Sequence, residues 1–262
     1  MKRIQILLIG VLLGSSVLGQ SLSDPKEIMK KSRDQSKLSG MEAKTTLEIN
    51  DGKGNQRMRE TSMASRIFQD GTEKRSIIFL APADVKGTGI LIWDFEGKED
   101  NMWIYMPALR KSRKIVSSEK SKNFMGSEFS NSDLAVGNID DFIYAMDGTE
   151  IVDQQICWKI KVTPLTPRIA GEYGFSLKTM WVSQKDFMPR KTTFLDTEGK
   201  PWKDLTYSGI KLMDAKSGKY FISHMEIKNL KNGRSSLMNM TDMKFNPAIN
   251  QELFTLAYIE KQ

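Results

Sequence analysis

Pairs of a polar residue and a glycine recur along the chain, and they constrain its fold more than any other feature. Such pairs form the tight turns that join neighbouring antiparallel strands. The segments between them are rich in β-branched and aromatic residues, as strands are. We therefore predict about eleven strands joined mainly as hairpins, which gives a mainly β fold with an antiparallel sheet or barrel. The pairs are Asp51-Gly52, Asp70-Gly71, Glu96-Gly97, Asp147-Gly148, Glu198-Gly199, Ser217-Gly218 and Asn232-Gly233, and the predicted strands cover residues 44–49, 56–68, 75–80, 90–95, 102–106, 156–162, 175–182, 191–195, 203–212, 220–230 and 235–245.

Short helices are expected near both ends of this β-rich region. Ser23 or Asp24 can cap a helix and Pro25 suits its first turn, so we predict a helix over residues 27–37. Residues 246–253 predict a short helix and residues 254–259 a last strand. Because no internal repeat or low-complexity linker interrupts the pattern, we expect a single domain over residues 20–262.

Two of the predicted strands are apolar on both faces. Residues 90–93 and 102–106 lack the alternation of an antiparallel sheet with one face in water. Both of their faces therefore need cover, from helices or from a ligand. Residues 107–146 carry few strand signals, and long irregular insertions in compact domains are often functional. We expect this middle region to form a lid or short helices over the concave side of the sheet.

The first nineteen residues have the three-part pattern of a secretory signal peptide. Lys2 and Arg3 give a positive start, residues 4–13 are almost wholly apolar, and small residues lead to Gly19, after which cleavage is expected. The apolar stretch is shorter than the roughly 20 residues that span a bilayer, so a retained anchor is the weaker alternative. We therefore expect an exported, periplasmic protein, away from the cytoplasmic pools of ATP and nicotinamide cofactors.

The residue inventory argues against enzyme chemistry. Cys157 is the single cysteine, so no intrachain disulfide can form, and we expect its thiol to be semi-exposed. The single histidine, His224, has no sequence partner for a catalytic triad or a metal site. The formal net charge of +7 suits solubility or contact with anionic membranes. We predict no catalytic residue, metal, cofactor or nucleic-acid partner, although a carboxylate pair for glycan hydrolysis would meet only in the fold.

Several blocks in the first half of the chain carry a family resemblance. They are LAPADVKGTG at residues 80–89, MWIYMPALRK at residues 102–111 with RKI at 113–115, and FMGS at residues 124–127 with Phe129 and Asp133-Leu134. In this order they resemble the outer-membrane lipoprotein-sorting protein family, the LolA-like periplasmic carriers of the kind found beside RND- or MmpL-type permeases. The resemblance extends over most of residues 24–258, and residues 80–134 are its specific part.

The resemblance implies an open, strongly curved antiparallel half-barrel with short helices over its concave face. It implies a monomeric periplasmic carrier or chaperone that binds the acyl chains of a lipid or lipoprotein in an apolar cavity and moves them toward the outer membrane. Transient contact with the membrane surface and an RND- or MmpL-type permease partner are also implied. A lipid-sensing regulator and a non-catalytic adaptor subunit of such an export complex are the alternatives.

Two groups of candidate site residues follow from these patterns. Flexible methionines and aromatic residues suit a surface that accepts variable apolar partners, while lysines and arginines suit lipid headgroups. Alternation along a strand means that not all of the apolar candidates can face one cavity. The lipid-cavity candidates are Trp93, Trp103, Tyr105, Phe124, Met125 and Phe129, and the candidates for headgroup or partner contact are Arg110, Lys111, Arg113 and Lys114.

Overall fold

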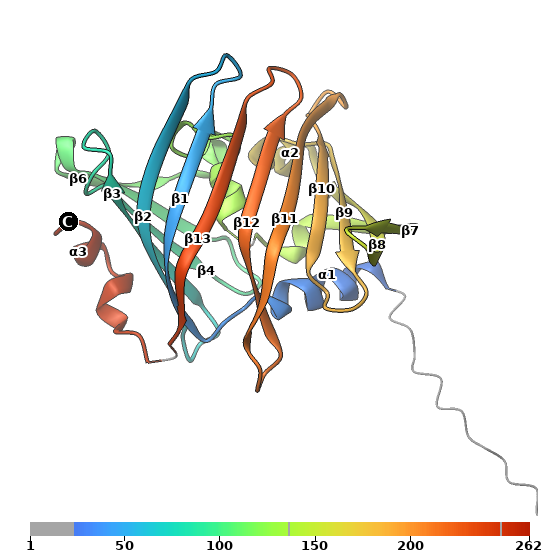
Figure 1. The fold of residues 1–262 in the computed structure, drawn as a ribbon, viewed down its shortest axis with the longest axis horizontal. Helices are drawn as coiled ribbons and strands as arrows, with labels where there is room; N and C mark the ends of the chain where they lie inside the picture. Colours follow the sequence, from blue (N-terminus) through green and yellow to red (C-terminus); the bar gives the residue numbers. More distant parts are fainter. Residues whose placement is uncertain (1–23, 136, 247) are drawn as a thin grey trace, which may run out of the picture.

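The computed structural model describes residues 24–135, 137–246 and 248–262, so the predicted signal peptide at residues 1–19 lies outside the described residues. The strands form one 13-stranded antiparallel sheet in the order β6-β5-β4-β3-β2-β1-β13-β12-β11-β10-β9-β8-β7. The sheet curls around its inner side without closing (Figure 1), which confirms the predicted half-barrel with two more strands than the eleven expected. The strands are β1 (Gly40–Asn50), β2 (Gln56–Ile67), β3 (Glu73–Ala81), β4 (Gly89–Asp94), β5 (Asn101–Met106), β6 (Lys111–Ile115), β7 (Phe142–Val152), β8 (Gln155–Pro164), β9 (Leu177–Ser183), β10 (Pro189–Leu195), β11 (Pro201–Asp214), β12 (Lys219–Asn229) and β13 (Ser235–Phe245).

The two additional strands, β6 and β7, are the edges of the sheet. Strand β6 was not predicted because four of its five residues, Lys111, Ser112, Arg113 and Lys114, are polar. Charged side chains on an edge strand prevent pairing with another chain, so its polarity fits its place. Only Ile115 at its end is buried in the core.

Strand β7 was not predicted because Asp147-Gly148 reads as a hairpin turn, and that interpretation is wrong. The strand continues through this pair, which instead forms an irregularity in the pairing with β8 between Met146 and Thr149. The turn lies further on, at Asp153 and Gln154, whose φ angles are 49° and 61°. Positive φ at both central residues defines the tight hairpin turn that Asn-Gly or Asp-Gly usually makes.

The helices are short. Helix α1 (Pro25–Gln35) begins as predicted, because the Asp24 carboxylate accepts a hydrogen bond from the Lys26 N–H at 2.9 Å. Helix α2 (Pro167–Tyr173) was not predicted, although Thr166 caps it and Gly174 ends it with a left-handed φ of 79°. The predicted last strand at 254–259 is wrong: Thr255 caps a helical turn instead. The remaining helical elements are α3 (Leu256–Ile259) and the 3-10 turns η1 (Pro107–Leu109), η2 (Ser117–Glu119), η3 (Phe124–Gly126), η4 (Asn131–Leu134), η5 (Ile139–Asp141) and η6 (Gln251–Phe254).

The strands that are apolar on both faces are covered on both faces. On the concave side, Ile90 and Ile92 of β4 belong to the main core together with Phe124 and Phe129 of the middle region. On the outer side, alternate residues of β4 and β5 pack against what we call the C-terminal segment, residues 248–260. Helix α1 covers the inner face of β8 and β9 through Ile28, and Figure 1 shows it behind that end of the sheet.

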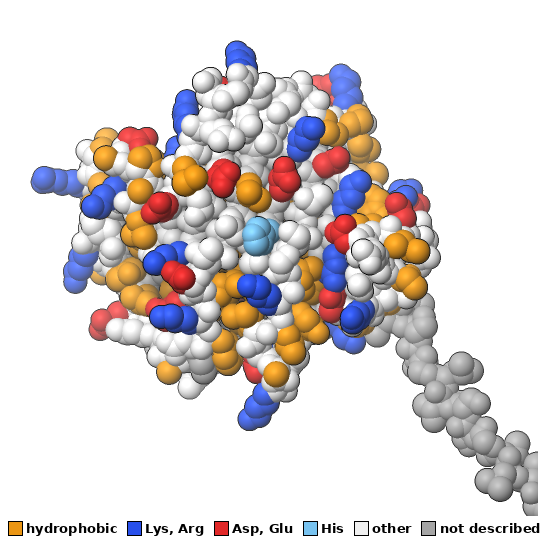
Figure 2. All heavy atoms as spheres, in the orientation of Figure 1, with side chains coloured by type: hydrophobic (Ala, Val, Ile, Leu, Met, Phe, Trp, Pro, Cys, Tyr) orange, Lys and Arg blue, Asp and Glu red, His pale blue; other side chains and the backbone are white. Residues whose placement is uncertain are grey.

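The outer face of the central strands faces solvent. Charged side chains of both signs surround the single histidine, His224, on this face (Figure 2). Cys157, expected to be semi-exposed, is instead fully buried, and this burial raises the pKa of its thiol. The connection between β9 and β10 lies beside it, where the Gln184 N–H donates to the Ile156 carbonyl at 2.9 Å.

Candidate functional site

The concave side of the half-barrel is occupied largely by the protein's own chain. We call residues 116–135 and 137–141 the inner segment; it connects β6 to β7 and contains four 3-10 turns, η2 to η5. It buries Phe124, Phe129 and Leu134 in the main core. The ring of Phe124 lies 6.0 Å from the ring of Phe79 on β3, centroid to centroid. This segment is therefore the cover that the sequence predicts for the middle region.

Among the described residues, three of the cavities lie between the inner segment, α1 and the sheet, with volumes of about 180, 200 and 230 Å³. Their walls are mainly aromatic, aliphatic and methionine side chains. The first cavity is lined by Phe129, Phe175, Phe194, Met225 and Met238, among others. Each is smaller than a typical pocket for a drug-sized ligand, which is about 300–1,000 Å³.

The three cavities are neighbours that share walls. Phe142, Lys178 and Met180 line both the first and the second cavity. Residues 133–135 of the inner segment line both the first and the third. An outward shift of this part of the inner segment would therefore join spaces that are now separated by a few side chains.

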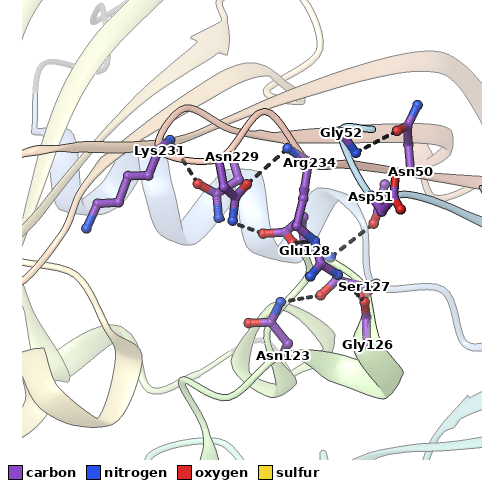
Figure 3. Close-up of polar contacts among 12 residues, drawn as sticks. Asn50, Asp51, Gly52, Asn123, Gly126, Ser127, Glu128, Asn229, Lys231 and Arg234 are labelled. Carbon is purple, nitrogen blue, oxygen red and sulfur yellow. Dashed lines mark hydrogen bonds and ion pairs between the residues drawn. The ribbon is translucent and has the colours of Figure 1, made fainter. Parts of the chain in front are cut away.

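A buried carboxylate holds the inner segment to the sheet (Figure 3). Glu128 is 2% exposed and accepts a hydrogen bond from the Asn229 side-chain amide at 2.7 Å. It also forms an ion pair with Arg234, whose Nε lies 2.8 Å from its Oε1. Its backbone takes part as well: its N–H donates to Ser236 Oγ at 3.0 Å, and its carbonyl accepts from Lys203 Nζ at 2.6 Å. We call these five residues the Glu128 cluster.

Ionisable side chains also face the first cavity. Lys178, Lys203, Asp133 and Tyr207 line it beside the apolar residues. Burial lowers the pKa of both lysines and raises the pKa of the Tyr207 hydroxyl. The Tyr207 hydroxyl and Thr192 Oγ1 lie 3.2 Å apart. The interior is thus apolar with a few polar groups, which is the usual composition of a small-molecule site.

The structure divides the six lipid-cavity candidates between the two faces of the sheet. Phe124 and Phe129 are buried on the concave side, with Met125 packed against the same core, and Phe129 lines the first cavity. Trp93, Trp103 and Tyr105 lie on the outer face under the C-terminal segment. Trp93 donates its indole N–H to the Phe254 carbonyl at 3.3 Å, and its ring lies 5.0 Å from that of Trp103. The six are therefore not brought together in one site.

The basic candidates form an exposed group at one edge of the sheet. Arg110 follows η1 with a left-handed φ of 48°, and Lys111, Arg113 and Lys114 are exposed on β6. Arg113 pairs with Glu119 of the inner segment at 2.7 Å. Their part in headgroup or partner contact stays a prediction.

Sequence reasoning did not single out Lys178, Tyr207 or Glu128. The sequence did contain a signal for Lys178. It precedes Met180 by two residues and Val182 by four, so all three lie on the same face of strand β9, which is the inner face. Glu128 gives no such signal, because its partners Asn229 and Arg234 are about a hundred residues away in the chain.

None of the described helices is long and apolar enough to cross a membrane.

The architecture defines a LolA-like half-barrel. A putative outer membrane lipoprotein-sorting protein domain from Vibrio parahaemolyticus superposes with a TM-score of 0.81 at 23% identity, covering 90% of this chain and 98% of that one. A DUF1329 family protein from Desulfovibrio piger gives 0.81 at 24% identity, over 90% and 100%. A LolA superfamily protein from Nitrosomonas europaea gives 0.67 at 18% identity, over 89% and 98%. These similarities confirm the resemblance at the level of the fold.

The family itself is shown by a sequence match. A family model described as "-like: Uncharacterized protein" matches residues 71–261, and the chain belongs to that family. The matched region contains β3 to β13, the inner segment and the C-terminal segment. A comparison with curated proteins gives no match.

Proposed function

We propose that the protein is a periplasmic carrier or chaperone that holds the acyl chains of a lipid or lipoprotein inside the half-barrel and moves them toward the outer membrane. The observation that carries this proposal is the row of three neighbouring, mainly apolar cavities under an inner segment that is built only of short turns. The lipoprotein-sorting name of one protein with this fold points the same way. In this proposal residues 1–19 direct export, residues 20–262 form one half-barrel domain, and no residue is catalytic.

The energetics of chain binding are favourable even though the inner segment fills part of the space. Burying one methylene stabilises by about 0.8 kcal/mol, so a chain of about fourteen methylenes gains roughly 11 kcal/mol. Exposing Phe124, Phe129 and Leu134 again would cost roughly 2–3 kcal/mol each. The gain therefore exceeds the roughly 6–9 kcal/mol that exposing all three side chains would cost. The difference is small, so the inner segment lowers the affinity for the chain and favours its release at an acceptor.

The exposed basic group at the β6 edge is the proposed contact with membrane headgroups or a permease. Arg110, Lys111 and Lys114 are exposed on the β5–β6 hairpin, and none of them lines the three cavities. Anionic membrane surfaces attract lysine and arginine by about 1 kcal/mol per residue near the surface. This arrangement supports transient docking while the cargo stays inside, with an RND- or MmpL-type permease as the proposed donor or acceptor.

Native mass spectrometry with lipid extraction tests the carrier. The protein is purified from the periplasm without detergent, as wild type and as two variants. Met225→Trp adds bulk at a residue that lines the first and third cavities, whereas Met58→Trp adds the same bulk at a side chain that is 54% exposed. We expect bound acyl lipid in the wild type and in Met58→Trp, and loss of it in Met225→Trp. Wild-type protein that stays empty even with lipid added would refute the carrier.

A filled interior also favours a second function, that of a non-catalytic adaptor subunit in an export complex. The inner segment occupies the centre of the concave side in the structure. An adaptor needs no exchangeable cargo, so protein that stays empty with added lipid and binds a membrane permease would support this function in place of the carrier.

A further inference from the structure

Lys178 is a basic side chain in a mainly apolar interior. Strand β9 directs it to the concave side, where it lines both the first and the second cavity. Its Nζ lies 5.3 Å from the ring centroids of Phe142 and of Phe175. Among the described residues it makes no ion pair or side-chain hydrogen bond, so aromatic rings are its close neighbours. A charged group in such surroundings is costly unless a counter-ion reaches it.

Three other polar groups of the first cavity, on Asp133, Lys203 and Tyr207, already have partners. Asp133 caps the inner turn η4 by accepting from the Ser130 N–H and the Ser130 hydroxyl, both at 2.7 Å. Lys203 donates to the Glu128 carbonyl at 2.6 Å, and Tyr207 contacts Thr192. The charge of Asp133 acts on Lys178, but the carboxylate is engaged within the inner segment. Lys178 is thus the cation of this cavity that remains available to a ligand.

We propose that Lys178 binds the anionic head group of a single-chain amphiphile, a carboxylate or a phosphate, whose chain lies in the joined cavities. This inference rests on the proposed function, because the cavities must admit an acyl chain, and it adds that the charged end enters the interior. The shared wall of the first and second cavities, formed by Phe142, Lys178 and Met180, places the ammonium where two apolar spaces meet. A head group at that point has one of these two mainly apolar cavities on either side of it for the chain.

The inference also limits the cargo. A hydrogen bond between charged partners is shorter and stronger than a neutral one, so the interior should prefer an anionic amphiphile to a neutral one of equal length. Loss of such a bond lowers affinity by about 10- to 100-fold. A neutral alcohol of the same chain length keeps the apolar contacts and loses only this bond.

Equilibrium binding of three probes to the purified protein tests the inference. The probes are palmitate, palmitoyl lysophosphatidate and hexadecanol, measured by calorimetry or by displacement of a fluorescent fatty acid. The variants are Lys178→Met, which keeps the bulk and removes the charge, and Lys178→Arg, which keeps the charge. Lys44→Met is the matched control, because Lys44 is 65% exposed on β1.

We expect wild type and Lys44→Met to bind at least one anionic probe about 10- to 100-fold more tightly than hexadecanol. Lys178→Met should remove this preference, and Lys178→Arg should retain most of it. The palmitate and lysophosphatidate arms tell whether a carboxylate or a phosphate is preferred. Equal binding of all three probes to wild type, or an unchanged preference in Lys178→Met, would overturn the head-group site and leave the carrier intact. Failure to bind any probe would overturn both.

Discussion

Replacing Glu128 by glutamine should loosen the inner segment while leaving its shape unchanged. The substitution keeps the size of the side chain but removes the charge that pairs with Arg234 and strengthens the bond from Asn229. Hydrogen bonds to charged groups contribute about 1.5–3 kcal/mol and neutral ones about 0.5–1.5 kcal/mol. Arg234 is about a third exposed, so water can solvate its guanidinium and replace part of the lost ion pair. We expect Glu128→Gln to lower the free energy of unfolding by about 2 kcal/mol.

Two measurements check this value. For a domain of this size, about 2 kcal/mol corresponds to a fall in Tm of roughly 4–8 °C. If the inner segment opens locally, hydrogen exchange of its amides should quicken by about 30-fold for the same free energy. The Phe124 N–H, which donates to the Phe129 carbonyl at 2.7 Å, is a suitable reporter.

The control is Glu198→Gln, which removes an exposed pair with Lys200 and should change neither quantity. An unchanged Tm together with unchanged exchange in Glu128→Gln would show that the Glu128 cluster does not hold the inner segment. A fall in Tm with unchanged local exchange would show that the cluster stabilises the whole sheet instead.

Two further predictions concern acidity and the outer core. Burial and the nearby charge of Asp94 raise the pKa of Asp100 to about 7. The folded state therefore holds this proton more tightly than the unfolded chain does. The stability that the protonated carboxyl contributes at low pH is lost as the pH rises from about 4 to about 7. Asp100→Asn should remove this loss, about 1 kcal/mol per pH unit in denaturant titrations, and an unchanged pH dependence would contradict it. Trp103→Ala should lower the free energy of unfolding by roughly 3 kcal/mol, because Trp103 packs against Trp93 on the outer face. The amount of lipid that co-purifies should stay unchanged. A folded variant without bound lipid would contradict this prediction and place Trp103 in the proposed lipid site.

Local sequence signals predict the helices, strands and turns of this fold better than they predict which of these elements contact one another. Asp51-Gly52 and Asn232-Gly233 lie in the loops that join β1 to β2 and β12 to β13, as predicted. The same kind of signal at Asp147-Gly148 fails, because a strand can absorb Asp-Gly as an irregularity when its neighbour still pairs on both sides. The turn at Asp153-Gln154 carries a weaker signal, since Asp accepts positive φ but Gln is not a usual choice for it.

The candidate site was predictable in kind but only partly in its residues. The strands that are apolar on both faces correctly predict that both faces of the sheet are covered there. The cover of the concave face is the inner segment, which lies in the middle region as predicted. The second cover is the C-terminal segment, and nothing in residues 90–106 indicates that a segment about 150 residues later packs on Trp93 and Trp103. Which face of the sheet carries the cavities therefore depends on long-range packing, and this is why three of the six apolar candidates lie on the outer face. Of the other three, only Phe129 lines one of the three cavities.

The strand order has a consequence for how the sheet assembles. Strands β1 to β6 pair only with sequence neighbours, and so do β7 to β13, apart from the single seam at which β1 pairs with β13. Each half can therefore form by successive local hairpins, while the seam joins residues such as Thr45 and Met240 from opposite ends of the described chain. Closing that long loop is the slow kind of step in folding. The two halves meet in the centre of the sheet, so the concave interior exists only after the last strand has joined the first.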